Sequence, residues 1–401
     1  AEMAIPFRSL RYFEGENEWG INFGRLDLKT NEKSAWAPVP RQFPHNSLPY
    51  AGTLVWDKPL DKAGLRLSVI PYFTSKVIKN TEADETTKWK WNAGFDTKMI
   101  LSTSMNLDLT VNPDYSQVEE DRQQTNLDRF ELFFPERRQF FLENSDLFAN
   151  LGNSKAQPFF SRRIGLNVPI NFGGRLTGRI GNKWRIGMMD MQTGSKDDNL
   201  ASNYAVAVLQ REIFSRSSIV GFLVNKEITQ SYSDTAFTAN HYNRVAGLEY
   251  NFASTDNRWQ GKTFFHQSFY PGAGKNAAAF SGNIGYFSQY LKASISQSYI
   301  GSDYIAEAGY IRRTGLFEIT PSVSYLFYPS HSEKIISHGP GANFNVVFDP
   351  EFKLTDRETE FSYTIGWKNK SQLSVSMQEE FILLSSDFDP TNTGGEKLDA
   401  G

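Results

Sequence analysis

Long stretches of this 401-residue chain alternate apolar and polar residues with a period of two. In residues 101–110 (LSTSMNLDLT) the odd positions are mostly apolar and every even position is polar. Residues 361–367 repeat the pattern, and after a turn at Asn369-Lys370 it resumes over residues 373–377. Because successive side chains of a strand point to opposite faces of its sheet, the pattern predicts long strands with one apolar and one polar face.

The same alternation recurs from Gly64 onward. It predicts further strands at residues 65–69, 184–191, 205–209, 219–225, 245–252, 261–269, 284–287, 291–297 and 318–327. The total is about ten to twelve strands, a number that membrane barrels use. Their polar faces suit a water-filled lumen better than the dry core of a sandwich. We therefore expect an all-β fold, an antiparallel transmembrane β-barrel that is incomplete in this chain.

The composition agrees with such a sheet. Aromatic residues make up 14% of the chain, yet its mean hydropathy is only −0.46. Membrane barrels combine these properties because only every second strand residue faces lipid and aromatic girdles border the apolar band. An aromatic-rich soluble sandwich or propeller has a similar composition. The sequence shows no fixed repeat of about 20 to 50 residues, which disfavours the propeller.

Several classes of protein are excluded by the sequence. No apolar run approaches the roughly 18 residues of a membrane-spanning helix. The net charge of −3, with Lys and Arg spread along the chain, provides no basic surface for nucleic acid. The chain contains no cysteine, so disulfides and thiolate chemistry are not available.

Catalytic motifs are missing as well. The sequence contains no Gly-x-Ser-x-Gly elbow, and no pair among its 45 Asp plus Glu residues is marked out for glycoside hydrolysis. Zinc-type spacing is not found among the five histidines, which are His45, His241, His266, His331 and His338. We expect no enzymatic activity, no metal and no cofactor.

The first 60 residues differ from the rest. Their alternation comes in short pieces, and prolines crowd the stretch from Trp36 to Pro59, where a regular hydrogen-bond ladder cannot continue. We interpret residues 1–60 as the end of a small β module with a linker, and residues 61–401 as the barrel. Trp19 and Trp36 are candidates for stacking on sugar rings, although a core role is the alternative. No signal peptide is visible at the start, so we expect a processed chain or a fragment.

Residues 112–172 interrupt the barrel pattern with the densest charge in the chain. An interruption of this length calls for an explanation. We expect either a plug in the lumen, with a core of Phe133, Phe134, Phe140 and Phe141, or a periplasmic or surface loop.

Charged residues of this segment are the candidate binding residues. Its carboxylates could hold calcium, but their spacing matches no EF-hand loop. The alternative is that these carboxylates and Glu136 form salt bridges with the neighbouring arginines. The arginines could line a constriction that selects anionic solutes, with structural pairing again the alternative. The candidates are Asp114, Glu119, Glu120, Asp121, Arg137, Arg138, Arg162 and Arg163.

Four motifs carry a resemblance to a known family: NPDYSQVEEDR (112–122), NLDRFELFFPERRQFFLENSDLF (126–148), PFFSRRIG (158–165) and GGRLTGRIG (173–181). The chain resembles a family of Gram-negative outer-membrane β-barrel proteins of unknown function. Its members follow an N-terminal module similar to family 9 carbohydrate-binding domains. AEMAIPFRSLRY (1–12) and EWGINFGR (18–25) resemble the last strands of that module. The resemblance implies further strands after a segment like residues 388–395, so we expect the closing strands to be missing.

The resemblance implies a location in the bacterial outer membrane and a function in envelope transport or carbohydrate handling. The expected partners are outer-membrane lipid or lipopolysaccharide, a saccharide and other outer-membrane proteins. One alternative is a non-conducting structural subunit of a larger outer-membrane complex. Another is a surface glycoside hydrolase, which requires a carboxylate pair at productive separation.

Overall fold

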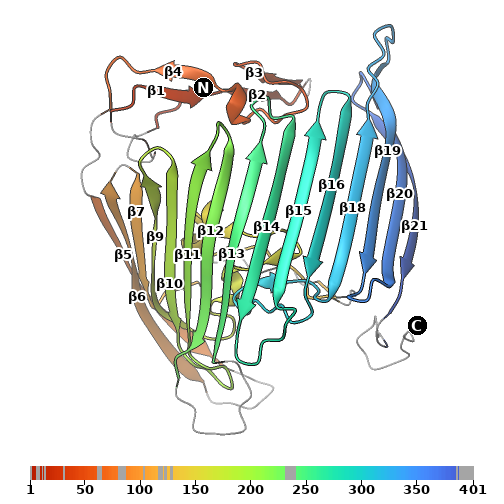
Figure 1. Cartoon of the computed structure of the whole chain (residues 1–401). Helices are drawn as coiled ribbons and strands as arrows, with labels where there is room; N and C mark the ends of the chain where they lie inside the picture. Colours follow the sequence, from red (N-terminus) through yellow and green to blue (C-terminus); the bar gives the residue numbers. More distant parts are fainter. Residues whose placement is uncertain are drawn as a thin grey trace.

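The computed structural model describes residues 2–5, 10, 12, 15–29, 32–60, 66–79, 87–102, 104–115, 121, 124–126, 130–230, 241–384 and 387. An antiparallel sheet of 15 strands dominates the fold, as the alternation predicts (Figure 1). Its strands, in chain order, are β5 (Arg66–Ile78), β6 (Lys88–Ser102), β7 (Met105–Val111), β9 (Ile170–Ile180), β10 (Trp184–Thr193), β11 (Ser202–Ile213), β12 (Ser217–Ile228), β13 (Tyr242–Ala253), β14 (Trp259–Phe269), β15 (Ala278–Phe287), β16 (Leu291–Ile300), β18 (Leu316–Tyr325), β19 (Ile335–Phe348), β20 (Leu354–Trp367) and β21 (Gln372–Ile382).

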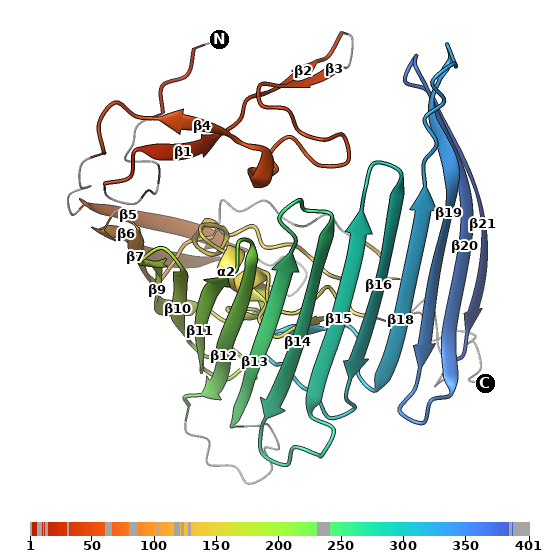
Figure 2. The same ribbon diagram turned by 45° about the horizontal axis from the view of Figure 1, so that its top comes forward.

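The sheet is strongly curved but not closed within the described residues. Each strand pairs with its neighbour in this order, and β5 and β21 form the two edges. Figure 2 shows the strands curling around a concave side, with β5 to β7 at one end and β19 to β21 at the other. The all-β antiparallel prediction is therefore confirmed, whereas a closed barrel is not present in the part of the chain that the structure describes.

Residues 101–110, which the alternation predicts to be one strand, contain the turn of a hairpin. β6 ends at Ser102 and β7 begins at Met105, so residues 101–110 span the reversal. A register shift between Ile100 and Ser102 pairs Met99 with Leu107. Odd positions therefore stay on one face on both sides of the turn, which is why the alternation passes through the turn uninterrupted.

The sheet also has more strands than the ten to twelve predicted. Two of those that the prediction missed, β9 and β19, contain Gly173-Gly174 and Gly339-Pro340-Gly341, residues that normally mark strand ends. Gly173 is needed for close packing, because a Cβ there would lie 2.2 Å from Met191 Sδ and 2.7 Å from the Asp190 carbonyl oxygen. In these two strands, tertiary packing overrides the tendency of glycine and proline to end a strand.

The two faces of the sheet differ in burial. On β12, Val220, Phe222 and Val224 are buried on the concave side, whereas Ile219 and Leu223 are exposed on the convex side. The described residues between β7 and β9, within 112–169, are called here the inner segment. They pack against the concave side and contain α1 (Gln139–Leu142), α2 (Asp146–Ala149), β8 (Ala156–Gln157) and the 3-10 helix η3 (Ser161–Arg163). β8 pairs with β17 (Tyr310–Ile311). The core of the molecule lies between the inner segment and the sheet.

The N-terminal residues form two small ribbons that lie across the strand ends on one side of the sheet, at the top of Figure 1. β1 (Glu18–Ile21) pairs with β4 (Gly52–Val55), and β2 (Gly24–Asp27) pairs with β3 (Glu32–Ala35). A 3-10 helix, η2 (Leu48–Tyr50), precedes β4, and the Tyr50 hydroxyl donates a hydrogen bond of 3.0 Å to the Asp256 carbonyl in the turn between β13 and β14. This part therefore contacts the strand turns at that end.

Candidate functional site

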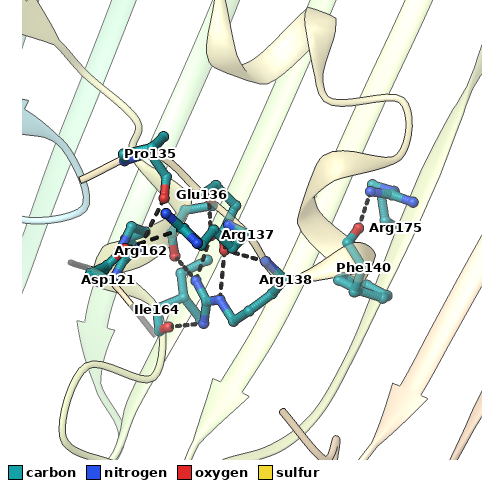
Figure 3. Close-up of polar contacts among 10 residues, drawn as sticks. Asp121, Pro135, Glu136, Arg137, Arg138, Phe140, Arg162, Ile164 and Arg175 are labelled. Carbon is teal, nitrogen blue, oxygen red and sulfur yellow. Dashed lines mark hydrogen bonds and ion pairs between the residues drawn. The ribbon is translucent and has the colours of Figure 1, made fainter. Parts of the chain in front are cut away.

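The centre of the inner segment is a buried arginine–glutamate pair (Figure 3). The Arg138 guanidinium donates to both carboxylate oxygens of Glu136, at 2.9 and 2.7 Å. It also donates to the carbonyls of Ile164 and Ser161, each at 2.7 Å. The pair joins the residues just before α1 to the 3-10 helix η3. Its side chains are only 13% and 12% exposed, so it belongs to the core of the segment.

Burial raises the pKa of the Glu136 carboxyl, but Arg138 reverses this effect. Hydrogen bonds and the positive charge from Arg138, with a further hydrogen bond from the Ser161 hydroxyl, hold the pKa below its ordinary value. Glu136 is therefore ionised and fully engaged at neutral pH. A carboxylate in this state is a structural anchor and not a general acid.

The remaining candidate arginines also have acidic partners within the segment. Arg162 pairs with Asp121 and donates 2.8 Å to the Pro135 carbonyl, while Arg137 Nε lies 3.4 Å from Asp121 Oδ1 (Figure 3). Arg163 pairs with Glu131, at 2.6 Å, which is not one of the predicted acidic residues. The structure thus brings Asp121 together with Arg137 and Arg162, whereas Arg138 pairs with Glu136 and Arg163 with Glu131.

The structure describes one of the three other predicted carboxylates. Asp114 lies on the chain that follows β7, whereas Glu119 and Glu120 fall outside the described residues. Over the described part of the chain, no group of three or more His, Asp or Glu side chains could hold a metal ion.

The predicted phenylalanine core is only partly assembled. Phe141 is buried in the main core, and Phe140 packs against that core and lies edge-on to Phe141. Phe133 instead stacks on Phe160 and lies edge-on to Tyr310, and it is half exposed. The contact of Phe134 is with the guanidinium of Arg162, 5.8 Å from the ring centroid. The four rings therefore lie in two places along the segment.

A second polar cluster, which sequence reasoning missed, attaches the inner segment to the sheet. Glu249 on β13 accepts a hydrogen bond of 2.6 Å from the backbone of Gly152 and contacts Lys262 Nζ at 2.7 Å and His266 Nε2 at 3.0 Å. Lys262 in turn donates to the carbonyls of Asn150 and Gly152, each at 2.6 Å. Lys262 and His266 lie on β14, on either side of Phe264, which is the cross-strand partner of Glu249, so the cluster depends on the register of β13 and β14.

Two adjoining cavities lie beside this attachment. The outer cavity, of about 850 Å³, lies between the N-terminal ribbons, the ends of β9 and β10, and α2, and Trp19 is among its lining residues. The inner cavity, of about 440 Å³, lies between α2 and the concave faces of β10 to β14. Both cavities are lined by Asp146, Leu147 and Arg185, so they meet at α2.

The two candidate tryptophans have different surroundings. Trp19 lies 5.7 Å from Tyr12 and 5.2 Å from Trp56 between ring centroids, within the outer cavity. Trp36 is 60% exposed, packs on Phe23 and Gly52, and does not line that cavity. The structure therefore places Trp19, and not Trp36, at the outer cavity.

Comparisons with known proteins give a family match but no activity. Residues 63–178, which run from before β5 through the inner segment and into β9, match the model of a domain of unknown function (DUF5916). No curated protein matches the chain. The crystal structure of Acinetobacter baumannii OccAB2 aligns with a TM-score of 0.35 and 8% sequence identity, over 82% of this chain and 85% of that chain. Among the described residues, no helix is long and apolar enough to cross a membrane.

Proposed function

We propose that this chain is an outer-membrane β-sheet protein that handles or transports a solute along its concave side. The observation that carries the proposal is the convex face, where large apolar side chains are exposed on strand after strand. Examples from well-separated strands are Phe73, Leu209, Leu223, Leu248, Phe265, Ile295 and Val375. Soluble proteins rarely expose contiguous apolar patches of this extent, whereas a lipid-facing sheet requires them.

The concave side supports the solute-handling part of the proposal. From β14 to β18 its side chains are mainly polar, including Ser268, Ser281, Ser298 and Glu318. A polar inner face and an apolar outer face are the arrangement of a membrane barrel with a wet interior. The inner segment occupies this interior as a plug would, and the cavities beside α2 offer space for a small molecule.

The firm attachment of the inner segment favours a second candidate, a non-conducting subunit of a larger outer-membrane complex. Lys98 binds Glu143 at 2.6 Å, and Arg185 binds Asp146 at 2.5 Å. Lys155 binds the buried Glu318. A plug held by ion pairs from several strands resists displacement, since each broken pair leaves charge in a partly buried site.

Conductance across planar bilayers distinguishes these two functions when it is measured with and without a covalent cross-link between the inner segment and the sheet. Because the chain contains no cysteine, the double variant Asn153→Cys/Ser281→Cys carries the only thiols. These positions are in hydrogen-bond contact, at 3.2 Å, across the boundary between the inner segment and β15. A short reducible bis-thiol reagent can therefore link the segment to the sheet.

Gated transport predicts conductance that falls on cross-linking and returns on reduction. The matched control is the single variant Asn153→Cys treated with the same reagent. If the unlinked full-length protein inserts into the bilayer and carries no current, transport is ruled out and the structural-subunit function takes its place.

A further inference from the structure

The outer and inner cavities, called here the outer and inner chambers, adjoin at Asp146, Leu147 and Arg185 and differ in the chemistry of their other lining residues. The outer chamber is faced by aromatic rings, with Trp19 between Tyr12 and Trp56, and at its borders by the charged side chains of Glu16, Glu18 and Arg179. The inner chamber is faced by uncharged hydrogen-bonding side chains, namely Gln210, Ser218, Asn251 and Asn150. The volumes of the two chambers are those of small-molecule sites, which combine apolar walls with a few polar groups.

The charged side chains of the inner chamber already neutralise one another. Arg185 is paired with Asp146 at 2.5 Å, and Lys262 is paired with Glu249 at 2.7 Å. Lys262 also donates hydrogen bonds to two backbone carbonyls of the inner segment. A charged ligand group that enters the inner chamber would have to break one of these pairs and leave its partner without a counter-ion. An uncharged ligand leaves both pairs intact.

We infer that the joined cavity binds an uncharged polyhydroxylated ring compound, with its ring face on Trp19 and its hydroxyls toward Gln210, Ser218 and Asn251. Aromatic faces accept the apolar face of a ring, while amide and hydroxyl side chains both donate and accept hydrogen bonds. The inference deepens the proposed function, on which it rests, by naming the class of solute. It also assigns the polar part of the site to the sheet and not to the N-terminal ribbons.

Calorimetric titration of the full chain tests the inference. The protein is purified in a detergent without a sugar headgroup, such as an alkyl amine oxide, so that the detergent does not occupy the cavity. The probes are neutral glucose, galactose and mannose oligomers of two to six units, with galacturonate oligomers as the charged comparison. Folding is checked by the β signal in circular dichroism before each titration.

Two pairs of variants locate the binding. Trp19→Ala and Gln210→Leu are expected to weaken binding of the neutral oligomers at least about tenfold, which corresponds to about 1.4 kcal/mol. Trp36→Ala and Gln267→Leu are the matched controls, because Trp36 does not line the cavity and Gln267 faces the convex side on β14. These controls are expected to bind like the unaltered protein.

The inference is overturned if no neutral oligomer binds the folded protein, if galacturonate oligomers bind more tightly, or if Trp19→Ala and Gln210→Leu both bind normally. These results are distinct from failure of the proposed function. A protein that inserts into membranes and conducts but binds no neutral oligomer refutes only the inference. A protein that does not enter membranes refutes the proposed function, whatever it binds.

Discussion

Arg175 on β9 and Asp108 on β7 lie directly opposite each other in the sheet and form an ion pair of 2.6 Å, with side chains only 1% and 6% exposed. The same guanidinium donates to the Phe140 carbonyl and lies 5.0 Å from the centroid of the Phe140 ring. The pair therefore joins two strands and the inner segment at one point. It anchors α1 to the concave side of the sheet.

Removing one member of this pair is expected to destabilise the protein strongly. Arg175→Met leaves the Asp108 carboxylate buried without its partner, at a cost of about 3–5 kcal/mol in the free energy of unfolding. The double variant Arg175→Met/Asp108→Leu removes both charges and should recover most of that loss. Urea unfolding in detergent micelles measures both. Equal stability of the single and double variants would contradict this role for the pair.

The Glu136–Arg138 pair predicts a pH dependence of stability. The pKa of Glu136 is lower in the folded protein than its ordinary value of 4.5, so the folded state favours the ionised carboxyl. The resulting stabilisation is complete above the ordinary value and is lost as the pH falls through the lowered folded value. We expect Glu136→Gln to be less stable than the unaltered protein at pH 7, with a difference that shrinks on acidification below about pH 4.5. Unfolding curves between pH 7 and pH 3 measure this difference in stability, with Glu227→Gln as an exposed control.

The proposed lipid-facing side predicts that arginine is tolerated on only one face of the sheet. Leu248, in the middle of β13, is 65% exposed on the convex side. Leu248→Arg should cost about 2–4 kcal/mol of stability in lipid vesicles, the penalty for arginine at the centre of the bilayer. Ser294→Arg, on the concave side of β16, should fold and insert normally. Equal behaviour of the two variants would refute a membrane location for the convex face.

Two glycines in the sheet should respond differently to alanine. Gly173→Ala places a Cβ against the Asp190 carbonyl oxygen, at 2.7 Å, where backbone must move. We expect a loss of about 1–3 kcal/mol, as for overpacked sites. Gly221→Ala meets only Leu248 Cδ2 at 3.5 Å and should be neutral. Thermal unfolding of the two variants side by side provides the measurement.

Much of the fold could be predicted from the sequence, because a sheet with one apolar and one polar face requires apolar and polar residues to alternate along each strand. Residues 205–209, 219–225 and 261–269 fall within β11, β12 and β14. The hairpin at Asn369-Lys370 lies between β20 and β21 as predicted. The turn between β6 and β7 escaped prediction because a register shift keeps the alternation in phase through it. Strands with glycine or proline, such as β9 and β19, were missed because neighbouring side chains decide whether those residues fit.

The sequence by itself determined the antiparallel all-β class and the interruption at residues 112–172, since both follow from local periodicity and charge density. It also pointed to an arginine-rich segment whose charges find partners nearby in the chain, such as Glu136 and Arg138. Only the tertiary structure decided that Glu249, Lys262 and His266 meet on the concave side, and that Trp19 faces a cavity shared with Arg185. Those contacts depend on strand register and on the placement of α2, which join residues far apart in sequence through packing that no local pattern encodes.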